Sequence, residues 1–178
     1  MALEFKEEEV NEKLIEDFKP LIKLHYDEIS FYKDEIKLNP NFDSYIRLYQ
    51  KNILKVYTAR EGGELIGYAI FFISPNMHYQ DSLQANQDIL YIRPDARGFG
   101  TEFIRWCDEQ LKELNVQLVL HHVKDAHNFG PKILEPLGYK LLDTVYGRII
   151  NREDSMAVTG SAAAVASTAL TGGIRNRD

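Results

Sequence analysis

Residues 89–104 read ILYIRPDARGFGTEFI, an apolar strand ended by Pro94 and followed by an Arg-Gly-x-Gly turn that opens an amphipathic helix. Gly98 and Gly100 have no Cβ, so the backbone is free to turn tightly between strand and helix. The first N–H groups of a helix have no partner inside it, and a tight turn lets several of them converge on one anion. This stretch therefore predicts a strand-turn-helix unit, and the turn either binds a phosphate or pyrophosphate group or is only a tight connection that binds nothing.

The composition sets limits on the class of protein. The chain has 178 residues, 44% of them apolar and 27% charged, which is ordinary for one globular domain. A net charge of −6 without a Lys/Arg cluster argues against a nucleic-acid partner and favours a neutral or cationic small molecule such as an amine. The acidic N-terminus and the lack of an apolar run of about 18 residues argue against a signal peptide and a membrane partner. We expect a cytoplasmic protein.

Cysteine and histidine spacing argues against a metal site. Cys107 is the only cysteine, so neither an intrachain disulfide nor a cysteine-rich zinc site can form. His78, His121, His122 and His127 match no strong ligand spacing. We expect no bound metal, and we expect Cys107 to be a buried thiol on the helix that follows Gly100.

Hydrophobic periodicity divides the chain into an α/β domain over residues 1–152 and a tail over residues 153–178. Asn11 is expected to cap the first helix, Pro20 to break or kink it and leave a second piece over about 21–31, and Gly62-Gly63 to form a hairpin turn. Strands are expected at 3–6, 53–59, 65–74, 88–92, 117–123 and within 139–150, a loop at 74–87, and helices at 11–31, 43–52 and 100–115. The strand-turn-helix-strand order from residue 88 to residue 123 predicts a right-handed crossover and a parallel pair.

The tail has a different composition from the domain. Residues 155–173 are almost wholly Ala, Ser, Thr, Gly and Val, and such a segment buries too little surface to offset its ordering entropy. Two interpretations stay open. The tail is either a disordered appendage, or a segment that docks on a protein partner or on a second copy of the chain in a homo-oligomer.

The frame x-Pro-x-x-Arg-Gly-x-Gly after a strand resembles the coenzyme A-binding motif of the GNAT superfamily of acyl-CoA-dependent N-acyltransferases. Residues 67–72 are similar to the third strand of that family, and residues 126–139, ending in Leu-Gly-Tyr, to its Asn-bearing helix. The residues around His121 and Asn128 look most like members encoded by tailed bacteriophages. The resemblance implies an α/β GNAT fold with a mixed, mostly antiparallel sheet, a splayed parallel central pair and flanking helices.

The resemblance also implies acetyl-CoA as cosubstrate and an amine as acceptor. The main chain of the central strand would bind the pantetheine arm, the glycine turn would hold the pyrophosphate, and the helix-start Asn would contact the cofactor. The cofactor-binding residues implied in this way are Leu90, Tyr91, Ile92, Arg97, Gly98, Phe99, Gly100, Thr101 and Asn128.

Two residues are candidates for the catalytic chemistry. Asp88 opens the central strand, and a carboxylate in a desolvating cleft accepts a proton from an ammonium either directly or through water. His121 and His122 are adjacent on a predicted strand and therefore point to opposite faces, so at most one of them faces the cleft. His122 is the second catalytic candidate.

Two positions depart from the family pattern. Glu102 places a carboxylate in the first helical turn, where it would repel a pyrophosphate. Leu134 stands where family members commonly carry the Tyr that protonates the leaving thiolate. Two functions therefore stay open. The chain is either an N-acetyltransferase in the cytoplasm, or a catalytically silent GNAT-fold structural or interaction protein, for example a phage virion component.

Overall fold

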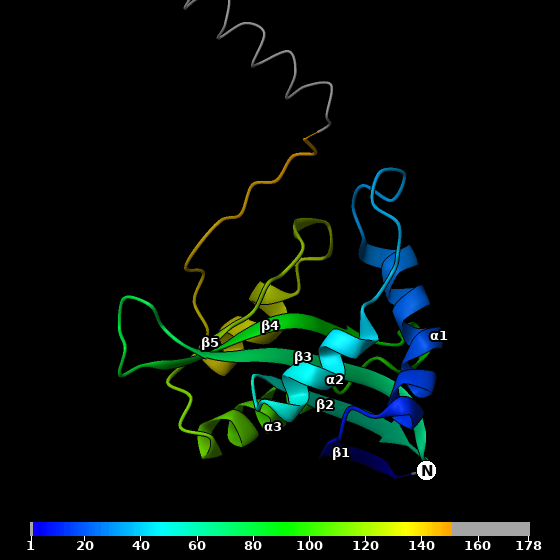
Figure 1. The fold of residues 1–178 in the computed structure, drawn as a ribbon, viewed down its shortest axis with the longest axis horizontal. Helices are drawn as coiled ribbons and strands as arrows, with labels where there is room; N and C mark the ends of the chain where they lie inside the picture. Colours follow the sequence, from blue (N-terminus) through cyan, green and yellow to red (C-terminus); the bar gives the residue numbers. More distant parts are fainter. Residues whose placement is uncertain (1, 151–178) are drawn as a thin grey trace, which may run out of the picture. The chain divides into compact units, whose positions relative to one another are not determined.

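The computed structural model describes residues 2–150, and within them a compact unit ending at Leu141 is built on a five-stranded sheet (Figure 1). The strands are β1 (Leu3–Glu7), β2 (Leu54–Glu61), β3 (Glu64–Pro75), β4 (Leu83–Ile92) and β5 (Leu118–Leu120). They lie side by side in sequence order. The pairs from β1 to β4 are antiparallel, and β4 pairs with β5 in parallel. The expected mixed, mostly antiparallel sheet with one parallel pair is confirmed.

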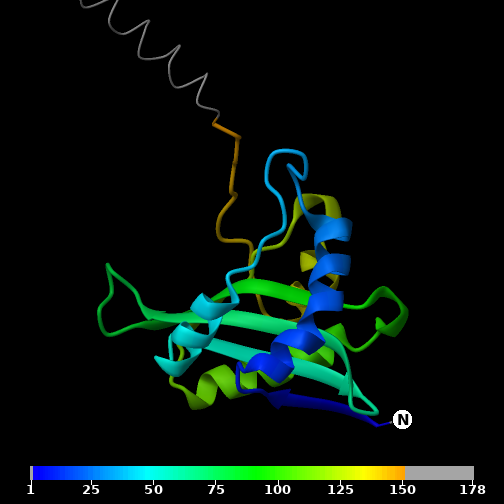
Figure 2. The same ribbon diagram turned by 45° about the vertical axis from the view of Figure 1, so that its right-hand side comes forward.

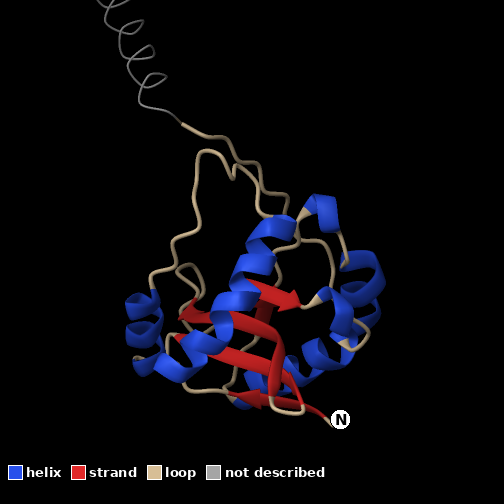
Figure 3. Cartoon of the chain, turned by 90° about the vertical axis from the view of Figure 1, so that its right-hand side faces the viewer, coloured by secondary structure: helices blue, strands red, loops and turns tan. Residues whose placement is uncertain are grey.

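Helices cover both faces of this sheet (Figure 3). α1 (Glu12–Ile29) and α2 (Phe42–Gln50) pack on one face, and α3 (Gly100–Glu113) packs on the other (Figure 2). The remaining helical segments are short turns: η1 (Pro94–Ala96), η2 (Asp125–His127), η3 (Gly130–Leu134) and η4 (Glu135–Leu137). None of the helices within residues 2–150 is long and apolar enough to cross a membrane.

α1 begins where the sequence predicts but does not break at Pro20. The Asn11 side chain accepts a hydrogen bond of 3.0 Å from the Leu14 N–H and so caps the helix. Pro20 lies within the continuous helix Glu12–Ile29, so of the two expected outcomes the break into separate pieces is wrong. Pro20 and Glu16 are both exposed, and water can bind the Glu16 carbonyl that loses its helical donor.

β4 is longer than predicted, while the hairpin turn between β2 and β3 forms as predicted. Gly62 and Gly63 have φ angles of 58° and 88°, as a tight two-residue hairpin turn requires. The loop expected over residues 74–87 spans only 76–82, because residues 83–87 already pair with β3. Polar residues such as Gln84 belong to a strand here because β3 and β5 supply partners on both sides.

The chain after α3 is less regular than predicted. β5 has three residues instead of the seven expected over 117–123. The helix expected over residues 126–139 is replaced by the turns η2, η3 and η4. Pro131 and Pro136 lack the N–H that a continuous helix needs, so only single turns form around them.

The last strands expected within residues 139–150 are absent from the described chain. The Tyr139 N–H bonds to the Leu134 carbonyl at 3.2 Å, and its hydroxyl donates to Asp108 at 2.6 Å. These bonds hold the start of the segment against the preceding turn and α3, away from a strand ladder. Residues 142–150 belong to a second unit and contain neither helix nor strand. The tail predicted over residues 153–178 lies outside the described residues.

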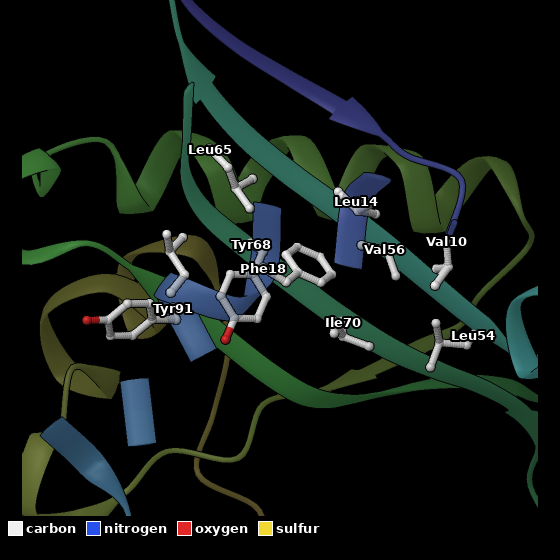
Figure 4. Close-up of a cluster of buried hydrophobic side chains, with 10 residues drawn as sticks. Val10, Leu14, Phe18, Leu54, Val56, Leu65, Tyr68, Ile70 and Tyr91 are labelled. Carbon is white, nitrogen blue, oxygen red and sulfur yellow. The ribbon is translucent and has the colours of Figure 1, made fainter. Parts of the chain in front are cut away.

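The alternation of side chains along the strands creates two buried clusters. On the face of α1 and α2 the cluster contains Phe18, Val56, Tyr68, Ile70 and Tyr91, with neighbours drawn in Figure 4. On the face of α3 a second cluster is built around fully buried residues of β2, β3 and α3. Its members include Cys107, which is 1% exposed, so the expected buried thiol is confirmed.

Candidate functional site

The sheet opens between its two parallel strands. β4 pairs with β5 only through Gln84, Ala85 and Asn86, opposite Leu118–Leu120. Beyond Asn86, β4 continues to Ile92 and, among the strands of residues 2–150, pairs with β3 alone. The side chain of Gln87 reaches across the start of this opening, where its Nε2 donates to the His122 carbonyl at 3.4 Å. The splayed central pair expected from the sequence is therefore present.

A β-bulge lies at the start of the opening. Ile70 pairs with Ile89 and Phe71 with Gln87, so Asp88 is the extra residue of β4. The bulge reverses the alternation of the strand. Gln87 lies on the α3 side, where it contacts His121, whereas Ile89 packs with the cluster under α1. The bulge thereby directs Asp88 to the face covered by α1 and α2, where Tyr45 contacts it.

The free edge of β4 offers backbone donors to the opening. The Arg93 N–H bonds to the Ile66 carbonyl at 2.8 Å, which places it on the side of β3. Backbone N–H groups alternate in direction along a strand, so those of Leu90 and Ile92 point to the edge that faces away from β3. The Arg97 Nε donates to the Ile92 carbonyl at 3.3 Å, consistent with this direction.

The turn after β4 presents the uncapped N-terminus of α3. Gly98 has φ 141°, a conformation that favours glycine. Phe99 at the N-cap makes no side-chain capping bond, and the first helical bond runs from the Phe103 N–H to the Phe99 carbonyl. The N–H groups of Gly100, Thr101 and Glu102 therefore have no partner within the helix, and in the described part of the chain they remain available to an anion.

Arg97 connects this turn to α1. Its guanidinium donates to Glu28 at 2.5 Å, and the Tyr91 hydroxyl donates to the same carboxylate at 3.2 Å. Burial alone would raise the pKa of Glu28, but the hydrogen bond and the charge of Arg97 hold it below its ordinary value. Burial, together with the charge of Glu28, raises the pKa of Tyr91 to about 12. The Arg97 guanidinium of the turn is therefore paired with an ionised carboxylate, that of Glu28.

A cavity of about 370 Å³ lies on the other side of β4, between α1, residues 30–40 and the sheet. Most of its lining is apolar, and it includes Phe18, Ile70 and Ile89. Tyr45 also lines it, and the Tyr45 hydroxyl donates to Asp88 at 2.9 Å. Asp88 is exposed. An apolar cavity with one carboxylate held beside it can take a molecule that is apolar at one end and cationic at the other.

His25 lines this cavity, and it was not identified from the sequence as a site residue. Its ring stacks on Tyr91 with centroids 4.8 Å apart, and its Nδ1 lies 3.2 Å from the Tyr68 hydroxyl. Burial lowers the pKa of His25 to about 4, because the charged form is poorly solvated there. The available signal was a polar residue on the apolar face of the first helix, in register with Phe18 and Ile22.

The two adjacent histidines have different surroundings. His121 packs against Phe71 and lies between Gln87 and Tyr139, with its Nε2 3.3 Å from the Tyr139 hydroxyl. His122 is exposed, just beyond β5 at the start of the opening. Of the two, His122 is therefore available to a ligand in the opening.

Three further residues that the sequence singled out lie near the turn or beyond β5. The Asn128 side chain accepts a bond of 3.0 Å from the Gly130 N–H and is exposed. Glu102 is exposed at the first turn of α3, and Leu134 is 7% exposed. In residues 2–150, no three His, Cys, Asp or Glu side chains group as a metal site would require.

The buried His121 predicts a loss of stability in mild acid. Burial, aided by the charge of His122, lowers the pKa of His121 from 6.5 to about 4. Between these values the unfolded chain binds a proton that the folded chain does not, so stability falls as the pH falls through this window. We expect His121 to contribute a loss of about 2 kcal/mol in unfolding free energy at pH 5 relative to pH 8.

Urea unfolding at both pH values measures this loss. His121→Gln should reduce the difference between pH 8 and pH 5, whereas His78→Gln, which removes an exposed imidazole from the β3–β4 loop, should leave it unchanged. The same pH difference in His121→Gln and in the parent chain would contradict the assignment of the effect to His121.

Comparison with known proteins identifies the fold. Neither protein-family models nor curated proteins give a match to the sequence. A ribosomal-protein-alanine N-acetyltransferase from Brucella melitensis biovar Abortus 2308 superposes with a TM-score of 0.63 at 17% identity, over 84% of this chain and 100% of the other. An aminoglycoside acetyltransferase from an uncultured soil sample gives 0.65 at 12% identity, over 84% and 95%. A transcriptional regulator from Bacillus halodurans C-125 gives 0.65 at 21%, over 84% and 100%.

These similarities confirm the expected GNAT fold. At such low identities they establish the fold alone. The resemblance to bacteriophage-encoded members stays a prediction.

Proposed function

We propose that the protein is an N-acetyltransferase that moves an acetyl group from acetyl-CoA to an amine. One observation carries the proposal: the free backbone edge of β4 and the uncapped N-terminus of α3 belong to one strand-turn-helix unit. The backbone edge of β4 suits an extended amide-bearing arm, and the N-terminus of α3 suits a pyrophosphate. Acetyl-CoA combines both groups. Two of the three structurally similar proteins described above are named as acetyltransferases, which supports this choice.

The residues present fit acetyl-CoA. The main chain of Leu90, Tyr91 and Ile92 would bind the pantetheine arm, and residues 97–101 would bind the pyrophosphate. Arg97 now holds the Glu28 carboxylate, which a phosphate of the same charge sign can replace. Glu102 is exposed, so its side chain can turn toward solvent. Asn128, exposed beyond β5, is the further contact that we propose for the cofactor.

Asp88 is the proposed general base. It lies at the bulge, on the face of the apolar cavity, and its Oδ2 is held by Tyr45. In the transfer the amine nitrogen bonds to the acetyl carbon, the bond from that carbon to sulfur breaks, and the amine proton passes to Asp88 directly or through water. Coenzyme A leaves as the thiol. Leu134 has no proton to donate, so we assign protonation of the sulfur to water or to the exposed His122.

Acetyl-CoA is expected to stabilise the folded protein. At one hundred times the dissociation constant, ligand binding adds about 2.7 kcal/mol to the unfolding free energy, which shifts the melting temperature of a chain this size by roughly 5–10 °C. A thermal melt with and without acetyl-CoA measures the shift. Adenosine, which lacks the pyrophosphate and the pantetheine arm, serves as the control and should give little shift.

The competing function makes the opposite prediction. Leu134, buried at the position of the expected acid, favours a catalytically silent protein with the same fold. No melting shift at millimolar acetyl-CoA, together with no release of thiol in the presence of amines, would support the silent protein.

A further inference from the structure

We infer that the acceptor is a primary amine carried on a single apolar group, such as a ring, which enters the cavity between α1, residues 30–40 and the sheet. The inference deepens the proposed function and rests on it for the chemistry of transfer. It does not rest on it for binding, because the cavity lies on the α1 face of β4 and the coenzyme site on the turn and free edge.

The size and the lining of the cavity determine the apolar part of the ligand. About 370 Å³ is at the small end of ligand-binding cavities, so it suits one ring or a short branched chain. Phe18 on α1 and Tyr68 and Ile70 on β3 line it, and Figure 4 shows these three side chains in the buried cluster. Burying a ring against such side chains is favourable because apolar surface leaves water.

Residues 30–40 extend the apolar lining to the mouth of the cavity. Ile36 and Leu38 line it and remain 57% and 40% exposed. This segment is fixed on α1, since the Tyr26 hydroxyl lies 2.9 Å from the Ile36 carbonyl. Large apolar side chains grouped at the edge of a cavity mark a binding surface more often than a solvent-facing loop. A ligand that fills the cavity would cover them.

The charges around the cavity determine the polar part of the ligand. Tyr45, in the lining, holds the Asp88 carboxylate at 2.9 Å, which provides an anion for an ammonium group. His25 is neutral at physiological pH because burial lowers its pKa to about 4, so it does not repel a cation. Lys37 also lines the cavity, and its ammonium donates to the Lys33 carbonyl at 2.9 Å. The net charge of −6 adds a general attraction for cations.

This arrangement selects against strongly polar acceptors. A polyamine or an amino sugar would bring additional charges or hydroxyl groups against Phe18, Ile70 and Ile89, which offer them no hydrogen bonds. An amine with one apolar group leaves no polar atom unpaired there, and its nitrogen lies beside Asp88. The amine then loses a proton and gains the acetyl group, with coenzyme A released as the thiol.

Three small probes separate the apolar contribution from the charged one. The probes are 2-phenylethylamine, ethanolamine, which lacks the ring, and 2-phenylethanol, which lacks the amine. Release of thiol from acetyl-CoA gives kcat/KM for the two amines, and calorimetry gives the affinity of each probe for the full chain. We expect kcat/KM for 2-phenylethylamine to exceed that for ethanolamine by about a hundredfold. We also expect 2-phenylethanol to bind more weakly than the phenyl amine.

Variants at the cavity mouth provide the matched test. Ile36→Ser should weaken 2-phenylethylamine binding about fivefold to tenfold. Met77→Ser, which removes an apolar side chain that is 94% exposed on the β3–β4 loop, should leave binding unchanged. Both residues are exposed, so neither substitution should prevent folding.

The outcomes distinguish this inference from the proposed function. If acetyl-CoA binds but ethanolamine or a polyamine is the better acceptor, the apolar acceptor is overturned and the proposed function survives. If 2-phenylethylamine binds and Ile36→Ser weakens it while acetyl-CoA does not bind, the cavity is a ligand site and the proposed function fails. Equal effects of Ile36→Ser and Met77→Ser would overturn the inference.

Discussion

Asp88→Asn is expected to reduce turnover by about 10² to 10⁴ while leaving the affinity for acetyl-CoA nearly unchanged. The amide has the shape of the carboxylate and still accepts the Tyr45 hydrogen bond, but it cannot take the proton from the amine. Asp88 is exposed and lies at the bulge of β4, so the substitution should not disturb the core. Thiol release at saturating acetyl-CoA and amine measures the change.

Two controls separate the proton acceptor from a general effect of charge. Asp81→Asn removes the same charge from the exposed β3–β4 loop and should leave turnover unchanged. Tyr45→Phe keeps the base and removes only its hydrogen bond, so we expect a smaller loss than for Asp88→Asn. If Asp88→Asn retains turnover within about threefold of the parent, proton removal belongs to His122 or to water.

The strand-turn-helix unit was predictable because local rules define it. Pro94 ends the strand, Gly98 takes a φ angle that other residues rarely adopt, and the apolar positions of α3 follow the helical period. The cap at Asn11 and the hairpin at Gly62-Gly63 depend on neighbouring residues in the same way. These features need no information about distant parts of the chain.

The start of β4 was not predictable because it depends on its neighbours. Residues 83–87 are polar enough to suggest a loop, and they form a strand because β3 and β5 pair with them. The bulge at Asp88 follows from the register with β3, and it determines that Ile89 faces α1. From the sequence, Asp88 was a candidate at the start of a strand. Its position beside Tyr45 required the fold.

Predictions from single residues were also misleading where contacts with distant parts of the chain determine the local structure. Pro20 indicates a break, yet its exposed position in α1 makes the lost hydrogen bond tolerable. His25 looked like part of an apolar stripe, and only the fold places it against Tyr68 and Tyr91. The cavity beside it contains residues from α1, α2 and three strands, a grouping that no local pattern encodes.

Arg60 is another residue whose role depends on distant partners. In the sequence it is a polar residue near the end of a strand, but in the fold it is 8% exposed. Its Nε and Nη2 donate to Glu8 and Asp17 at 2.6 and 2.7 Å, and its Nη1 donates to the Gly63 carbonyl at 2.9 Å. Asp17 belongs to α1, so this network ties that helix to β2. α1 in turn forms one wall of the apolar cavity.

Arg60→Met is therefore expected to lower the unfolding free energy by about 3–5 kcal/mol, since it leaves the mostly buried Glu8 carboxylate with only the Lys6 ammonium, 3.7 Å away, as a cationic partner. Burial alone would raise the pKa of Glu8, and the hydrogen bond and charge of Arg60 hold it below its ordinary value. Without the arginine that pKa should rise above its value in the unfolded chain, so the variant should lose stability as the pH rises from the unfolded pKa to the new folded pKa, with no further loss above it. Urea unfolding at pH 7 measures the main effect.

Two comparisons decide whether the loss comes from the carboxylate that has lost Arg60. Lys23→Met breaks an exposed ion pair with Asp27 and should cost less than about 1 kcal/mol. The double variant Arg60→Met, Glu8→Leu removes the stranded carboxylate, so it should be more stable than Arg60→Met alone. If the double variant is the less stable of the two, the cost arises from lost packing around Arg60. In that case the Arg60 network would hold α1 through side-chain packing and not through charge pairing.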